Sequence, residues 1–212
     1  MNSYKTVNGV CENITVIERS KFICRIKGVA DETEAKAFIA ETRKANSLAN
    51  HNCYAYIADE NGLTEKFSDD GEPQGTAGKP MLEVLRGGGF RKTVAVVTRY
   101  FGGVKLGTGG LVRAYGGAVS ECLKKAAVMD MKRAVFLNVK TDYEGYNAII
   151  RLSKNKTFSV FGTDYGGEIT LHIAAPLLER DSVIKSVTDS TLGRAVITVT
   201  KEDYFDFGGL CR

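Results

Sequence analysis

The first part of the chain alternates short strand patterns with helical ones. Apolar and polar residues alternate with a period of two in several runs, which is typical of half-buried strands. Asp31, with Glu34 three residues later, has the spacing of a capping box and predicts the start of a helix. Asn61-Gly62 is a strong hairpin turn. The predicted elements are two strands within residues 14–29, a helix from residue 31, strands at 51–58 and 63–68, a loop at 69–80, a short helix at 81–86 and a strand at 93–98.

The pattern restarts after Asp130–Arg133, which we interpret as a domain boundary. The second part predicts strands and helices in the order βαββαβ, within the length of one small domain. We therefore expect an α+β protein with domains at residues 1–130 and 134–212. The elements are strands at 135–140, 157–161, 168–174 and 195–200 with helices at 143–152 and 177–187, while the tail after Glu202 has no clear assignment.

One glycine-rich stretch, Arg99–Gly117, stands between the strand at 93–98 and a long helix. Seven glycines lie within its sixteen positions from Gly102 to Gly117. Apolar residues then recur at helical spacing, and Thr108 is a plausible N-cap. A glycine-rich turn into a helix start presents free backbone N–H groups and the positive end of the helix dipole, so the stretch predicts an anion site.

The distribution of charged residues along the chain supports binding to an anionic partner. The net charge is +4, and residues 1–133 carry 20 basic and 15 acidic groups against 9 and 10 in residues 134–212. No Asp or Glu occurs between Val84 and Ser120, whereas residues 59–72 hold six acids. An uncompensated basic surface attracts phosphate-rich partners. The predicted anion- or nucleic-acid-binding residues are Arg99, Lys105, Gly107, Thr108, Gly109, Gly110 and Arg113, with Lys79, Arg91 and Lys92 as extensions.

Two alternatives stay open for the charged residues. Arg113 could pair with the acids at 69–72 instead of a ligand. Asp69, Asp70 and Glu72 could hold a divalent ion or act as paired carboxylates. However, acids beside Gly and Pro are more often turn formers, and the spacing of a calcium loop is absent.

Other chemistry is less well supported. Five widely spaced cysteines and two histidines, His51 and His172, argue against a disulfide framework or a zinc site. Cys53 near His51 is more simply a core thiol than a nucleophile, because no third group orients the pair. Gly78-Lys79 fails the P-loop pattern, since Pro80 stands where Ser or Thr would hold magnesium.

We expect no catalytic residues, no cofactor and no metal. We also expect no signal peptide and no membrane span, and thus a cytoplasmic protein.

Two stretches closely resemble the YigZ/IMPACT family. They are S-D-D-G-E-P-Q-G-T-A-G-K-P-M, from Ser68, and T-R-Y-F-G-G-V-K-L-G-T-G-G-L-V-R-A-Y, from Thr98. The resemblance covers about residues 14–125 and implies a first domain with the fold of domain 2 of ribosomal protein S5. The second part resembles the ferredoxin-like C-terminal domain of bacterial YigZ proteins, itself similar to the last domain of elongation factor G.

The resemblance also implies an association with translation. Eukaryotic IMPACT proteins restrain the kinase that senses amino-acid starvation, but through an accessory domain that we do not find here. We therefore expect a non-enzymatic protein that binds RNA, the ribosome or a translation factor. A proline-dipeptidase activity, sometimes attached to bacterial members, is rejected because nothing resembles a dinuclear metal site. The alternatives are a small-molecule phosphotransfer or nucleotide-binding enzyme on the same fold and a protein-interaction adaptor; the sequence leaves the oligomeric state open.

Overall fold

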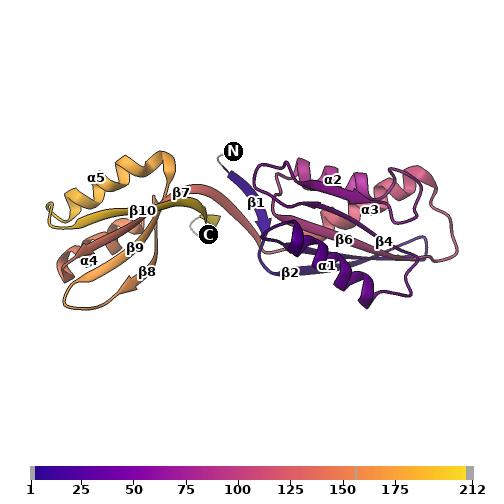
Figure 1. The fold of residues 1–212 in the computed structure, drawn as a ribbon, viewed down its shortest axis with the longest axis horizontal. Coiled ribbons are helices and arrows are strands. Elements are labelled where there is room, and N and C mark those ends of the chain that lie inside the picture. The colour runs from indigo at the N-terminus through magenta and orange to yellow at the C-terminus, as the bar shows by residue number, and fades with distance from the viewer. Residues whose placement is uncertain (1–2, 156, 209–212) are drawn as a thin grey trace. The chain divides into compact units, whose positions relative to one another are not determined.

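A computed structural model describes residues 3–155 and 157–208 of the chain (Figure 1). The chain divides into two compact units, Ser3–Met129 and Asp130–Arg212, which we call unit 1 and unit 2. Both combine helices with antiparallel sheet strands, so the chain is a mixed α/β protein.

Unit 1 is built on a five-stranded antiparallel sheet with the strand order β2-β3-β6-β4-β5. Strand β5 is therefore an edge strand. The N-terminal strand β1 lies beside Phe90, where the Lys5 N–H donates to the Gly89 carbonyl at 2.9 Å. The elements are β1 (Ser3–Val7), β2 (Val10–Ile17), β3 (Ser20–Gly28), α1 (Glu32–Ala45), β4 (His51–Ile57), β5 (Glu65–Ser68), α2 (Gly78–Gly87), β6 (Thr93–Tyr100) and α3 (Gly107–Lys125).

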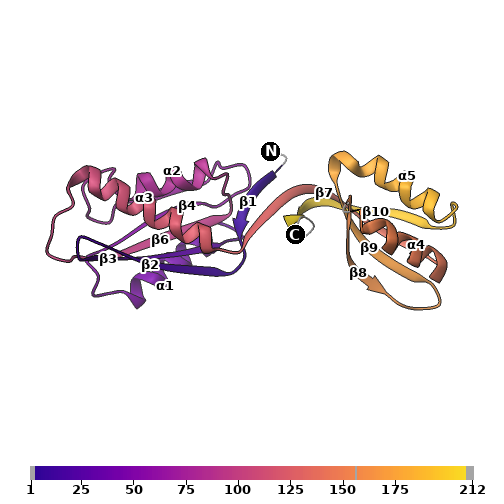
Figure 2. The same cartoon turned by 180° about the vertical axis from the view of Figure 1, so that it is seen from behind.

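Helices cover both faces of this sheet, with α1 on one face and α2 and α3 on the other (Figure 2). The central strand β6 shows why. Val94 and Val96 pack with α1, whereas Ala95 and Val97 pack with the core that includes α2 and α3. Successive side chains of a strand point to opposite faces, so a continuous apolar run is expected where both faces are buried.

Unit 2 has the element order βαββαβ and the strand order β10-β7-β9-β8. Both helices pack on one face of this antiparallel sheet, over Leu137, Leu171 and Ile173. The other face carries a cluster of aromatic rings that includes Phe136 and Phe205. The elements are β7 (Val128–Thr141), α4 (Tyr143–Ser153), β8 (Ser159–Asp164), β9 (Ile169–Pro176), a 3-10 turn (Leu177–Glu179), α5 (Arg180–Ser190) and β10 (Val196–Asp206).

Most predicted strands and helices are confirmed, and the differences have local causes. Asp31 caps α1 by accepting a hydrogen bond from the Glu34 N–H at 2.9 Å, as predicted. Thr108 is not the cap of α3, because the helix begins one residue earlier and Leu106 precedes it. Helix α2 begins at Gly78, inside the predicted loop. The proposed boundary residues 130–133 lie within β7, and β10 extends into the tail to Asp206.

Candidate nucleic-acid interface

The glycine-rich loop after β6 is held tightly against the β2–β3 turn. A Cβ on Gly102 would lie 2.0 Å from the backbone carbon of Arg19, so only glycine fits there. Gly103 and Gly107 have φ of +87° and +69°, a backbone region that other residues rarely adopt. Gly109 has no such requirement, since the nearest atom to an added Cβ is Nη1 of Arg113 at 3.7 Å. Close approach and backbone geometry thus explain several of the glycines.

The first turn of α3 is open to solvent. Gly107, Thr108 and Gly109 are exposed, no acidic residue lies in this turn, and no side chain caps it. The first four N–H groups of a helix have no partner within the helix, and they carry partial positive charge. These N–H groups can therefore donate hydrogen bonds to an anion or to water.

Helix α2 differs, because its start is already occupied. The carboxylate of Asp69 accepts hydrogen bonds from the N–H groups of Gly75, Ala77 and Gly78 at 2.8, 3.0 and 2.8 Å. Asp69 therefore acts as a structural anion within its own loop. Of the two helix starts on this face of the sheet, only that of α3 is left for an external anion.

Three of the predicted cations stand exposed around this face. Lys79, Lys105 and Arg113 are solvent-exposed, and no ion pair joins any of them to a described residue. The guanidinium of Arg113 lies back over Gly109. The alternative pairing of Arg113 with the acids at 69–72 is not found, because Asp70 binds Arg43 at 2.7 Å and Glu72 binds Arg99 at 2.7 Å.

Arg99 is a correction to the predicted surface. Its side chain is only 6% exposed, and its guanidinium donates to the Glu72 carboxylate and, at 3.3 Å, to Ser20 Oγ. The rings of Phe22 and Phe101 each lie 5.4 Å from this guanidinium. Alternation along β6 could have revealed this, since Arg99 shares the inward parity of Ala95 and Val97. Arg99 is a core residue and not a solvent-facing phosphate contact.

The prediction also placed Arg91 and Lys92 on the surface around the start of α3, and the structure places them elsewhere. They precede β6, whereas Lys105 follows it, and an eight-residue strand spans roughly 26 Å. Lys92 pairs with Glu60 at 3.7 Å, and Arg91 Nη1 donates to the Phe90 carbonyl. These two cations therefore lie at the other end of β6, away from the start of α3.

Glu72 organises a buried polar cluster that the sequence did not reveal. Besides Arg99, it accepts a hydrogen bond from the Tyr115 hydroxyl at 2.8 Å, and His51 Nε2 lies 3.8 Å away. Burial, followed by the nearby Cys53 and Glu72, raises the pKa of Tyr115 far above its usual value. Glu72 therefore serves an internal hydrogen-bond network. In the part of the chain that is described, no three His, Cys, Asp or Glu side chains group to hold a metal ion.

Cys53 does not have the properties of a nucleophile. Burial raises the pKa of its thiol to about 12, so the reactive thiolate is scarce at neutral pH. Its Sγ donates to the Asp69 carbonyl at 2.9 Å, while His51 Nδ1 lies 2.8 Å from the Asp70 carbonyl. Both side chains bind the backbone of the loop that follows β5, which supports a structural role.

A cavity of about 270 Å³ lies beside the start of α3. The buried Arg99–Glu72 pair contributes to its lining, with Lys105, Gly107 and Thr108 on the side of the helix. Its remaining lining residues are apolar: Pro73, Phe101, Leu106 and Leu111. The cavity thus joins the open helix start to a preformed polar pair.

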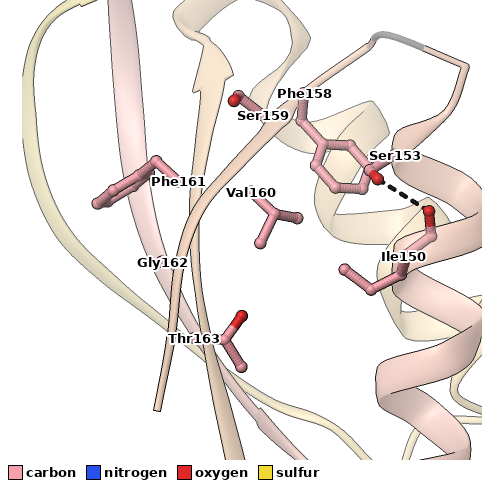
Figure 3. A pocket seen from close by; sticks show the side chains of 8 residues that line it. All are labelled: Ile150, Ser153, Phe158, Ser159, Val160, Phe161, Gly162 and Thr163. Carbon is pink, nitrogen blue, oxygen red and sulfur yellow. Dashed lines mark hydrogen bonds between the residues drawn. The ribbon is translucent and has the colours of Figure 1, made fainter.

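A larger cavity, of about 490 Å³, lies in unit 2 between α4 and β8 (Figure 3). Among the described residues, no charged side chain lines it. Val160 and Thr163 point into it, whereas Phe161 points away, and the Ser153 hydroxyl donates to the Ile150 carbonyl at 2.9 Å (Figure 3). The described lining therefore offers hydroxyl groups but no acidic or basic side chain. No helix among residues 3–155 and 157–208 is both long and apolar enough to cross a membrane.

Comparisons with known proteins cover nearly the whole chain. Residues 18–123 match the model of the Impact N-terminal domain. The chain is 39% identical to IMPACT family member YvyE of Bacillus subtilis, over 97% of this chain and 95% of that protein. It is 34% identical to IMPACT family member YigZ of Escherichia coli, over 89% and 95%. The crystal structure of a hypothetical protein, 32% identical, superposes with a TM-score of 0.60 over 96% of this chain and all of the other. The chain belongs to the IMPACT family.

Proposed function

We propose that this protein is a non-enzymatic, RNA- or ribosome-associated member of the IMPACT family that acts in translation or its regulation. In this proposal unit 1 binds the phosphate backbone through the first turn of α3 together with Lys105 and Arg113, and Lys79 extends the surface. The observation that carries it is the open start of α3, which has no acid, no cap and two exposed cations without ion pairs.

The fold assignments belong to the same proposal. We assign unit 1 to the fold of ribosomal protein S5 domain 2 and unit 2 to the ferredoxin-like fold. The βαββαβ order of unit 2 and the position of its helices on one face of an antiparallel sheet support the second assignment. The link to translation rests on the family resemblance, so it needs a direct test.

The charge balance of unit 1 favours phosphate over base recognition. Phosphate contacts by Lys, Arg and helix starts position a nucleic acid without reading its sequence. The exposed residues of the first turn itself, Gly107, Thr108 and Gly109, provide no set of side-chain donors and acceptors for base edges. We therefore expect binding that depends strongly on salt and weakly on RNA sequence.

The test is a series of RNA titrations at several salt concentrations. Arg113→Ala and Lys105→Ala should each flatten the dependence of log K on log salt by about 0.7 for single-stranded RNA. Lys124→Ala is the matched control, since Lys124 is an exposed cation in the last turn of the same helix. Equal salt slopes for all four proteins would refute the interface.

The cavity beside α3 favours one competing function, a small-molecule phosphate enzyme. A pull-down from ribosome-containing lysate, with and without nuclease, separates the candidates. Nuclease-sensitive recovery supports RNA binding, and nuclease-insensitive recovery of one protein supports an adaptor. A nucleotide retained through purification, detected by mass spectrometry, supports the enzyme.

A further inference from the structure

A second basic groove lies on the opposite face of the unit 1 sheet, beside α1. It has a volume of about 250 Å³ and is formed between α1 and the strands β4 and β5. Since β5 is the edge strand, the groove lies at the border of the sheet. Its lining consists of Lys36, Ile39, Ala40, Arg43, Tyr54, Tyr56 and Lys66.

Every charged side chain in this lining is a cation. Lys36 and Arg43 are seven residues apart on α1, which places them two turns apart on the same side of the helix. Lys66 stands opposite Tyr56 in the β4–β5 ladder and therefore points to the same side of the sheet. The three cations thus approach one groove from two separate elements.

The acids that balance these cations lie outside the lining. Lys36 pairs with Glu32 at 3.0 Å, and Arg43 pairs with Asp70 at 2.7 Å. Lys66 is exposed and forms no ion pair with any described residue. The groove therefore offers an anion Lys66, which has no ion pair although the Glu32 carboxylate lies within its electrostatic reach, and two further cations at its wall.

The floor of the groove is aromatic. The rings of Tyr54 and Tyr56 are nearly parallel, with an interplanar angle of 7° and centroids 6.2 Å apart. The guanidinium of Arg43 lies 5.5 Å from the centre of the Tyr54 ring. Tyr56 is buried and donates its hydroxyl to Glu32, but Tyr54 is half-buried. A planar group can therefore pack against the Tyr54–Arg43 pair.

Cations that line a groove together with flat aromatic rings are the combination that proteins use for single-stranded nucleic acid. Bases stack on aromatic side chains and on Arg guanidinium planes, while Lys and Arg follow the phosphates. An acidic peptide would use the cations but would have no need of the rings. The chemistry of this groove therefore favours a nucleic-acid strand over a protein segment.

We propose that the α1–β5 groove binds single-stranded RNA, with one base packed against Tyr54 and Arg43 and the adjoining phosphates beside Lys36 and Lys66. The inference rests on the proposed function and extends it, because this contact lies on the sheet face opposite to α3. An RNA strand bound at both the α3 start and the α1–β5 groove would pass around the sheet of unit 1 and contact both of its faces.

The experiment measures the anisotropy of a fluorescein-labelled oligouridylate of roughly 12 nucleotides, within the usual site sizes for single strands. Lys66→Gln should flatten the dependence of log K on log salt by about 0.7. Tyr54→Leu should weaken binding roughly 5- to 100-fold and leave the salt slope unchanged, because it removes stacking and no charge. Tyr54→Phe keeps the ring and should bind like the unaltered protein.

Lys44→Gln is the matched control, since Lys44 is an exposed cation on α1 outside the groove and the charge change is the same. Thermal melts of all variants exclude unfolding as the cause. If Arg113→Ala weakens binding while Lys66→Gln and Tyr54→Leu behave like Lys44→Gln, the groove is refuted and the α3 interface stands. A loss with Lys66→Gln but not with Tyr54→Leu refutes base stacking and reduces the groove to a phosphate contact. No binding of RNA by the unaltered protein refutes both proposals.

Discussion

The substitution Thr108→Asp tests the open start of α3 most directly. Thr108 is the second residue of the helix and is exposed, and no acid or side-chain cap occupies the first turn. An aspartate there places a carboxylate at the positive end of the helix dipole. The same change should therefore stabilise the folded protein and weaken RNA binding, two effects that a merely damaging mutation would not combine.

Both magnitudes follow from the position of Thr108. A negative charge in the first turn of a helix stabilises it by about 0.3–1 kcal/mol. For a chain of this size, that raises Tm by roughly 1–4 °C. On the binding side, the new charge offsets about one cation of the interface, so the salt slope should fall by about 0.7. On going from 1 M to 0.1 M salt, the variant should therefore gain about fivefold less affinity than the unaltered protein.

The assay combines thermal melts followed by circular dichroism with RNA titrations at three or more salt concentrations. Thr108→Asn is the control, because it has nearly the shape of aspartate without its charge. A Thr108→Asp protein that melts higher and binds RNA with unchanged affinity would show that no phosphate approaches α3. A protein that melts lower would show that this turn is packed and not open.

Four further outcomes follow from the structure. Arg99→Ala should destabilise unit 1 by about 3–5 kcal/mol in urea unfolding, because Glu72 is then buried without its cation; unaltered stability would mean that the pair is solvated. Asp69→Ala should cost about 1–3 kcal/mol and speed amide exchange at Ala77 and Gly78, which lose their acceptor, and unchanged exchange would contradict the capping role. Burial raises the folded-state pKa of Cys53 from 9.0 to about 12, so the stability that the neutral thiol contributes is present below pH 9 and is lost as the pH rises toward 12. The Cys53→Ala protein should therefore lose less stability than the unaltered protein over that range. Parallel curves of unfolding free energy against pH for the two proteins would refute the raised pKa of Cys53. Limited proteolysis should release a fragment of roughly domain size from each side of the joint near residue 130, whereas one protected core of full length would argue against separately folded domains.

The sequence by itself determined the elements and the family. Period-two alternation located the strands, and the Asp31–Glu34 spacing located the start of α1, because both depend on residues that are neighbours along the chain. The apolar, β-branched composition of residues 93–98 indicated a buried strand, which is β6. Two long motifs were specific enough to indicate the IMPACT family.

The tertiary structure decided which charged residues remain available. The basic stretch from Val84 to Ser120 looks uniform in the sequence, yet Arg99 is buried, Lys92 lies at the far end of the sheet, and Lys105 and Arg113 are exposed. Burial of Arg99 depends on Glu72, which reaches it only when the loop after β5 folds back over β6. Alternation along β6 indicates the inward face of Arg99, but a local pattern cannot report its pairing with Glu72, because the two residues are separated along the chain.

The α1–β5 groove is a second case. Lys36 and Arg43 belong to a helix, and Tyr54 and Lys66 belong to two paired strands, so no short motif contains them. Strand register puts Lys66 opposite Tyr56, and the packing of α1 on that face brings its cations to the same place. Local periodicity fixes which face of its own element a side chain occupies. Only the packing of the elements fixes what that face meets, because those contacts are long-range.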